Sequence, residues 1–190
     1  MEMSQQQAPE GAESVRDPVD SIAAAWRRER PQTSVASIGV VTRIWQLAKH
    51  FGDDRRRVLA EAGIDSATLD LLSTLRRSGP PYTLTTRELA EQSLVTAGAI
   101  SQRVARAERE RLVTRRPAPG RSRAVLVELT AAGHDLVERT VDQVLSREIE
   151  LLDGLTAEQR DSLAELLRTL LGDVQEKLNL QGVSHVGHGA

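Results

Sequence analysis

The chain has 190 residues, of which 39% are hydrophobic and only 2% aromatic, and its formal net charge is −2. This length suits one domain with extended ends, and the absence of cysteine excludes disulfides, thiolate metal sites and thiol redox sensing. No apolar run approaches the roughly 20 residues of a membrane-spanning helix, and the N-terminus lacks the basic-then-apolar pattern of a secretion signal. We therefore expect a soluble, cytoplasmic protein.

Charge is distributed unevenly along the chain. Residues 103–123 hold eight arginines and two glutamates, a net charge of +6, whereas residues 131–178 carry a net charge of −6. Apart from Lys49 and Lys177 every basic residue is arginine, whose planar fork suits phosphates and guanine edges. One segment is therefore predicted to meet a polyanion and the other to stay away from it.

The first elements are predicted to be helices. Residues 1–16 are polar and predicted to be disordered. Asp17 is a candidate N-cap for an amphipathic helix over 18–30 that carries Trp26 on its apolar face, where a core or interface position is the simplest interpretation. Apolar residues at three-to-four spacing predict a longer helix over 35–62.

A helix-turn-helix pattern follows. Asp65 or Ser66 caps a third helix that ends before Pro80 and Pro81. Thr85 or Thr86 caps a short helix, a break follows at 93–96, and a longer basic helix is predicted over 97–112. A short helix, a tight turn and a basic second helix are typical of DNA-binding helix-turn-helix motifs.

A basic hairpin comes next and predicts a wing. Residues 112–114 and 124–129 are expected to form strands, joined by a turn-rich loop. Its tip carries Arg121 and Arg123, which would reach the minor groove or phosphates beside the groove occupied by the helix.

The remaining chain is predicted to form two leucine-rich helices over 131–152 and 156–178, which with 35–62 make a plausible dimer interface. We therefore expect a mainly α fold with a small β-hairpin wing. The expected divisions are a disordered N-terminus (1–16), an N-terminal helix and dimerisation helix (17–62), a winged helix-turn-helix DNA-binding domain (63–130), C-terminal dimerisation helices (131–178) and a flexible tail (179–190).

Helical geometry divides the arginines of the basic helix. At about 100° per residue, Arg109 points about 180° and Arg106 about 120° from the inward Ile100, whereas Arg103 lies about 60° away. Arg103 therefore needs an anionic partner inside the protein, and Asp70, Glu110 or a ligand are the candidates. Asp70 itself lies off the leucine stripe of its helix, so an exposed position is its simplest interpretation. The candidate DNA contacts are Ser101, Gln102, Arg106 and Arg109 on the helix and Arg121 and Arg123 on the wing.

This order of elements resembles the MarR family of winged-helix transcriptional regulators. The resemblance covers roughly residues 35–178 and rests on "TTRELAEQSLVTAGAISQRVARAERERLVTRR" and "SRAVLVELTAAGHDL". Wings of this family usually carry Asp-x-Arg, whereas this chain has Arg121-Ser122-Arg123. Arg123 matches the wing-tip arginine of the family best.

The chain also resembles the urate-responsive (HucR- and PecS-like) subgroup of that family. This subgroup has an extra N-terminal helix with a Trp, which Trp26 matches here. It also has an Asp and two arginines, which Asp70, Arg103 and Arg115 match. The resemblance implies that Trp26 and Arg103 hold the ligand, that Asp70 responds to its negative charge, and that Arg115 ties Asp70 or the ligand to the DNA-binding lobe.

These observations together predict a homodimeric, ligand-responsive DNA-binding regulator, most simply a repressor of a pseudo-palindromic operator released by urate. A phenolic or other aromatic carboxylate as ligand, or a winged-helix module for protein interaction, are the alternatives. The sequence shows no catalytic constellation and no cofactor motif. His185 and His188 alone are too few for a metal site, so no enzyme, cofactor or metal is expected.

Overall fold

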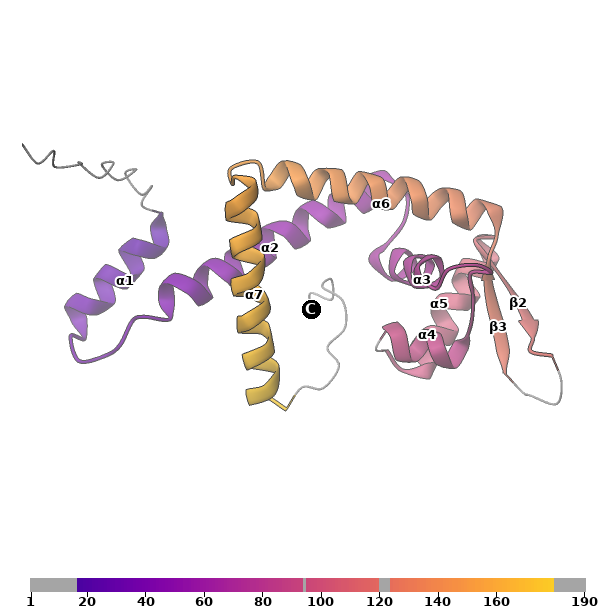
Figure 1. The fold of residues 1–190 in the computed structure, drawn as a ribbon, viewed down its shortest axis with the longest axis horizontal. Helices are drawn as coiled ribbons and strands as arrows, with labels where there is room; N and C mark the ends of the chain where they lie inside the picture. The colour runs from indigo at the N-terminus through magenta and orange to yellow at the C-terminus, as the bar shows by residue number, and fades with distance from the viewer. Residues whose placement is uncertain (1–16, 94, 120–123, 180–190) are drawn as a thin grey trace, which may run out of the picture. The chain divides into compact units, whose positions relative to one another are not determined.

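The computed structural model describes residues 17–93, 95–119 and 124–179. The chain divides into two compact units, Met1–His50 and Phe51–Ala190. The described residues form seven helices in the predicted order and three strands, one more than predicted (Figure 1). None of these helices is long and apolar enough to cross a membrane.

In the first unit, one arginine ties two helices together. Helix α1 (Pro18–Glu29) is capped by Asp17, which accepts hydrogen bonds from the backbone N–H groups of Val19 and Asp20. Helix α2 (Ile38–Glu61) begins in this unit, and its Arg43 donates hydrogen bonds to Asp17 at 2.7 Å and to Asp20 at 2.9 Å. The hydrogen bonds from Arg43 hold the pKa of Asp17 below its ordinary value. Helix α2 starts three residues later than the helix predicted over 35–62. The Ser37 carbonyl accepts hydrogen bonds from the N–H groups of Val40 and Val41 in its first turn.

The second unit is organised around α3 (Ser66–Arg77). This helix packs against α4 (Thr86–Ser93), α5 (Ala97–Arg109), α6 (Ala131–Leu151) and strand β3 (Val125–Leu129). Its four leucines are almost fully buried, and with Leu89, Ile100, Val104, Val127 and Val137 they form an aliphatic core. Each helix of the motif has a side-chain cap, which fixes where it begins: Asp65 for α3, Thr85 with Glu88 for α4, and Thr96 for α5.

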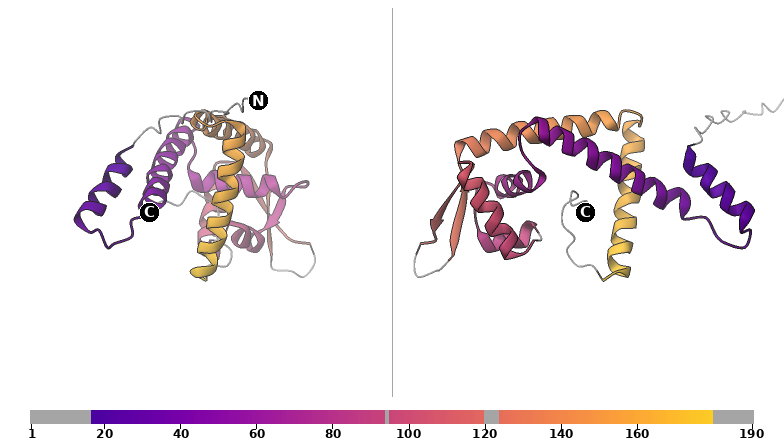
Figure 2. Two further views of the ribbon diagram at one scale, coloured as in Figure 1. Left: turned by 60° about the vertical axis from the view of Figure 1, so that its left-hand side comes forward. Right: turned by 180° about the vertical axis from the view of Figure 1, so that it is seen from behind.

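A small antiparallel sheet closes the domain in the order β1-β3-β2. Strand β1 (Thr83–Thr85) was not predicted, and it pairs with β3 immediately before α4 begins. Strand β2 (Val113–Pro117) runs further than the predicted strand, through Arg116 and Pro117, which the sequence placed in the loop. Proline is accommodated because β2 is an edge strand. The β2–β3 hairpin projects from the domain beside α5 (Figure 2).

The start of α6 lies directly against the turn between α5 and β2. The Thr130 hydroxyl donates to the carbonyl of Arg111 at 2.7 Å and accepts from the N–H of Gly133 at 3.0 Å. A Cβ atom at Gly133 would lie 2.0 Å from the backbone oxygen of Leu112. Only glycine therefore permits this approach between α6 and the base of the wing.

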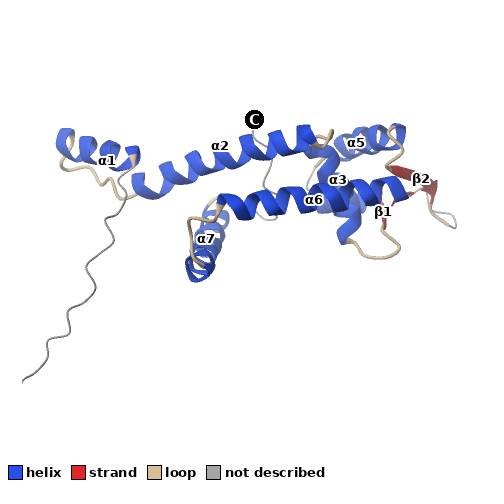
Figure 3. Cartoon of the chain, turned by 90° about the horizontal axis from the view of Figure 1, so that it is seen from above, coloured by secondary structure: helices blue, strands red, loops and turns tan. Residues whose placement is uncertain are grey.

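The C-terminal helices carry the exposed apolar surface of the second unit. Helix α6 lies alongside the second half of α2 (Figure 3). Helix α7 (Ala157–Lys177) has no buried residue. The exposed large apolar side chains of these two helices and the residue that follows them are Leu145, Ile149, Leu151, Leu163, Leu166, Leu167, Leu170, Leu171, Val174 and Leu178.

The contact at Gly133 generates a first prediction. Gly133→Ala is expected to lower the free energy of unfolding by about 2–3 kcal/mol, because the new methyl group overlaps a backbone atom. Gly172→Ala, on α7 with nothing near its Cβ position, is the control and is expected to raise it by about 0.5–1 kcal/mol. Urea unfolding followed by circular dichroism measures both. Equal effects of the two substitutions would contradict this account of the junction.

Candidate nucleic-acid interface and its internal ion pairs

The outer face of α5 is the surface on which DNA contact is predicted. The inward residues Ile100, Val104 and Ala107 are at most 1% exposed, as the helical rotation predicts. The four candidate contacts on this helix lie on the exposed side: Ser101, Gln102, Arg106 and Arg109. The structure therefore brings these four residues onto one accessible face.

Arg106 is exposed but held by carboxylates. Its guanidinium forms an ion pair with Asp65, the N-cap of α3, and a second with Glu110 at 3.0 Å. Burial opposes ionisation of Asp65, but hydrogen bonds from Thr68 and the charge of Arg106 outweigh it and lower the pKa of Asp65. Arg109, one turn further along, has no ion pair with a described residue. Arg106 and Arg109 thus share the exposed face of α5, but only Arg106 forms ion pairs with described residues.

Arg103 lies on the buried side and pairs with Asp70. The guanidinium donates to the Asp70 carboxylate at 2.8 Å, and the two side chains are only 13% and 14% exposed. Of the two protein partners that the sequence left open for Arg103, the structure selects Asp70. The interpretation of Asp70 as an exposed residue is wrong, because α3 is covered by its neighbours on both sides of the leucine stripe.

Arg115 does not contact Asp70. It lies at the start of β2 and forms an ion pair with Glu108 of α5. The hydrogen bond from Arg115 lowers the pKa of Glu108, and the same bond raises that of Arg115. The resemblance implied a contact with Asp70 or a ligand; the structure instead shows a link between the wing and the helix next to it.

The remaining predicted site residues are Trp26, Arg121 and Arg123. Trp26 is on α1, in the first unit, and is 46% exposed, so it is not a core residue of that unit. Arg121 and Arg123 lie outside the described residues. The neighbouring Arg116 is exposed on β2 and lies 3.4 Å from Glu128 of β3.

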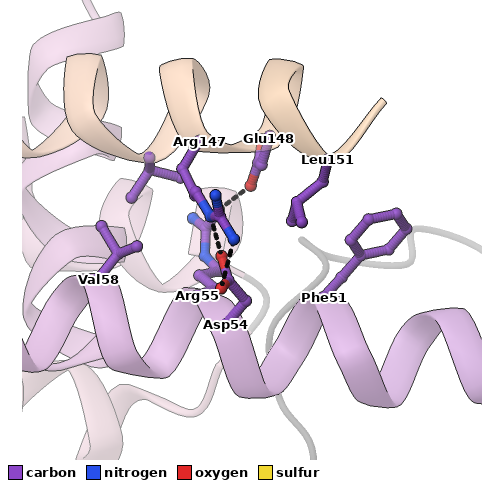
Figure 4. A pocket seen from close by; sticks show the side chains of 8 residues that line it. Phe51, Asp54, Arg55, Val58, Arg147, Glu148 and Leu151 are labelled. Carbon is purple, nitrogen blue, oxygen red and sulfur yellow. Dashed lines mark hydrogen bonds and ion pairs between the residues drawn. The ribbon is translucent and has the colours of Figure 1, made fainter. Parts of the chain in front are cut away.

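One pocket that sequence reasoning missed lies between the second half of α2 and α6 (Figure 4). It is a small depression open to solvent, and none of the predicted ligand residues lines it. Asp54 pairs with Arg147 at 3.0 Å and Arg55 with Glu148 at 2.7 Å across it. Hydrogen bonds from Arg147 and Arg57 hold the pKa of Asp54 below its ordinary value. Each of the arginines at positions 55–57 is thus paired with a carboxylate.

Comparison with known proteins agrees with this architecture. Residues 62–124 match the sequence model of the MarR family. The HTH-type transcriptional regulator PecS of Dickeya dadantii (strain 3937) is 29% identical over 163 residues, which cover 84% of this chain and 94% of PecS.

Two solved structures extend the comparison. Sco3205, a MarR family transcriptional regulator from Streptomyces coelicolor solved in complex with DNA, is 29% identical, with a TM-score of 0.62 over 75% of this chain and 94% of Sco3205. NadR in complex with 4-hydroxyphenylacetate is 27% identical, with a TM-score of 0.54 over 73% of this chain and 95% of NadR.

The fold and the exposed basic helix are similar to those of winged-helix regulators such as Sco3205. The family matches place the chain more narrowly. Its MarR family domain lies within residues 62–124, and its likeness to PecS extends over most of its length.

The Arg103–Asp70 pair generates a second prediction. Asp70→Asn and Arg103→Gln are each expected to lower the free energy of unfolding by about 3 kcal/mol, because each removes one charge of a largely buried ion pair. The double variant is expected to be more stable than the sum of the singles implies, by about 1–3 kcal/mol. Urea unfolding measures all three.

A control for this cycle is the exposed pair of Glu165 and Arg168 on α7, whose side chains are 69% and 68% exposed. Removing either partner is expected to change stability by less than about 1 kcal/mol. Additive effects of Asp70→Asn and Arg103→Gln would show that the two side chains do not interact in solution.

Proposed function

We propose that this protein is a homodimeric repressor that binds a pseudo-palindromic operator and is released from it by a small anionic aromatic ligand, with urate as the first candidate. The observation that carries the proposal is the buried pair of Arg103 and Asp70, which joins the recognition helix α5 to α3 at 2.8 Å. A charge pair at this position makes the placement of α5 sensitive to an anion.

DNA binding is supported by the accessible face of α5. In the proposed complex, two recognition helices enter successive major grooves about one helical turn apart. Arginine forks bind guanine edges or phosphates, and the glutamine amide binds a base edge. The proposed contacts are Ser101, Gln102, Arg106 and Arg109, with Arg121 and Arg123 of the wing.

The homodimer is supported by the leucines that a single chain leaves exposed. Large apolar side chains exposed on both α6 and α7 are typical of an interaction surface. The net charge of −6 over residues 131–178 keeps this surface away from DNA. The helical segments 17–62 and 131–178 are therefore proposed as dimerisation regions that flank a DNA-binding domain at 63–130.

Ligand control is proposed to act through the charges of the buried pair. An anion that reaches Arg103 competes with Asp70 for the guanidinium and repels the Asp70 carboxylate. The displaced carboxylate no longer holds α5 against α3, so the ligand favours a state that does not fit the operator. Arg115 carries the change to the wing through Glu108. Trp26, half exposed on α1, supplies a flat ring and an N–H donor for a heterocycle.

A phenolic carboxylate is the second candidate ligand. NadR, a structural neighbour of this chain, was solved with 4-hydroxyphenylacetate. A carboxylate would pair with Arg103 as a urate anion would.

DNA contact predicts a strong effect at Arg109. A duplex is first selected from a random-sequence pool by the wild-type protein, and its Kd is measured by fluorescence anisotropy. Arg109→Ala is expected to weaken binding about tenfold or more, in keeping with about 1–3 kcal/mol for a lost base contact. Arg168→Ala, which removes the same charge from α7, is the control and leaves the Kd unchanged. Equal Kd values for the wild type and Arg109→Ala would remove α5 from the interface.

Ligand control predicts that urate releases the protein from this duplex. It also predicts that substitutions of Arg103 and Asp70 impair different steps, urate binding in one case and DNA release in the other. Arg103→Gln is expected to abolish urate binding, whereas Asp70→Asn binds urate but releases DNA poorly, because the repelled charge is missing. Calorimetry with urate and anisotropy of the DNA complex separate the two. Release by 4-hydroxyphenylacetate alone would assign the ligand to the second class, and release by neither would refute control through Arg103.

A further inference from the structure

We propose that Asp65 and Glu110 compete with DNA for Arg106 and thereby set the affinity of the recognition helix for the operator. The inference rests on the proposed function, because it requires that α5 faces DNA. It assigns two carboxylates as affinity-determining residues, although neither side chain is suited to contact a phosphate.

The competition follows from how Arg106 is held. Its side chain is 49% exposed on the outer face of α5, and its Nε lies 3.0 Å from a carboxylate oxygen of Glu110. Its Nη1 is paired with Asp65. An arginine in this state must give up at least one carboxylate before its fork can bind a phosphate or a guanine edge.

Asp65 cannot follow Arg106 toward DNA. One of its carboxylate oxygens accepts the backbone N–H of Thr68 at 2.8 Å and caps α3, while the other holds Arg106. Glu110 is the C-cap residue of α5 through its backbone N–H, and its side chain pairs with Arg106, four positions earlier. The Asp65 carboxylate is thus anchored to the backbone of α3, so contact of Arg106 with DNA breaks this pair rather than carrying it along.

The pairs are of the right strength to adjust affinity without preventing binding. The side chains of Asp65 and Glu110 are 44% and 43% exposed, and ion pairs this exposed are weak and screened by salt. The buried pair of Arg103 and Asp70 is a different case, with both side chains less than 15% exposed. Arg106 is therefore restrained, Arg103 is committed to the interior, and Arg109 meets DNA without competition from a described ion-pair partner.

The test removes the two carboxylates in two backgrounds. Asp65→Asn keeps the helix cap, since asparagine caps as well as aspartate, and Glu110→Gln keeps the shape of the side chain. The duplex selected by the wild-type protein is the probe, and its Kd is measured from 50 to 300 mM KCl. The double variant is expected to bind about three- to tenfold more tightly at each salt concentration, because Arg106 no longer has to leave its carboxylates before it binds DNA.

The same substitutions in an Arg106→Ala background separate competition from simple repulsion. With no arginine to compete for, Asp65→Asn and Glu110→Gln are expected to leave the Kd unchanged. Tightening of equal size in both backgrounds would show that the carboxylates merely repel DNA, and no tightening in the Arg106 background would show that the pairs do not restrain it. Either result overturns the inference.

Two controls complete the experiment. Glu165→Gln on α7 removes one exposed carboxylate and is expected to leave the Kd unchanged, and thermal unfolding confirms that each variant is folded. If the wild-type protein selects no duplex at all, the proposed function itself fails and the inference falls with it. If it selects one but the two backgrounds respond alike, only the inference fails.

Discussion

Helix α3 is covered on several sides at once, and this constraint determines much of the domain. Helices α4, α5 and α6 and strand β3 all pack on it, and its four leucines are at most 3% exposed. Asp70 is its one acidic residue and lies within this packed environment. Because a buried carboxylate is tolerated only with a partner, the position of α3 requires Arg103, and Arg103 in turn fixes how α5 lies against α3.

The arginines of α5 form a graded series from the interior to the surface. Arg103, Arg106 and Arg109 are spaced by three residues, so each is rotated by about 60° from the one before. The first is buried in an ion pair, the second is half exposed and held by Asp65 and Glu110, and the third faces outward with no described ion-pair partner. A single repeated spacing therefore yields three roles, which are decided by the carboxylates that the fold places beside each arginine.

Local signals in the sequence predicted most of the fold. They did not predict which strands or which charged residues, far apart in the sequence, pair with one another. Helix caps and periodic leucines located every helix, because those patterns are complete within a few residues. Strand β1 was missed, since three residues carry too little pattern until β3 pairs with them. The direction of Arg103 was predictable from helical rotation, but its choice of Asp70 depends on packing between residues 33 positions apart. The same holds for Arg106 and Asp65, 41 positions apart, and for the pairing of Arg115 with Glu108.

The difference between buried and exposed pairs explains why control by a small anion would be centred on Arg103. Exposed pairs such as Arg106 with Glu110 are worth little, because water and salt already compete for both charges. Breaking the pair of Arg103 with Asp70 instead leaves charges in a poorly solvated site, where an incoming anion changes the balance by several kcal/mol. Shifting an allosteric equilibrium needs only about 1–3 kcal/mol. In the proposed function, a ligand at this pair would therefore command enough free energy to displace α5, and the surface pairs would adjust how tightly the helix binds DNA.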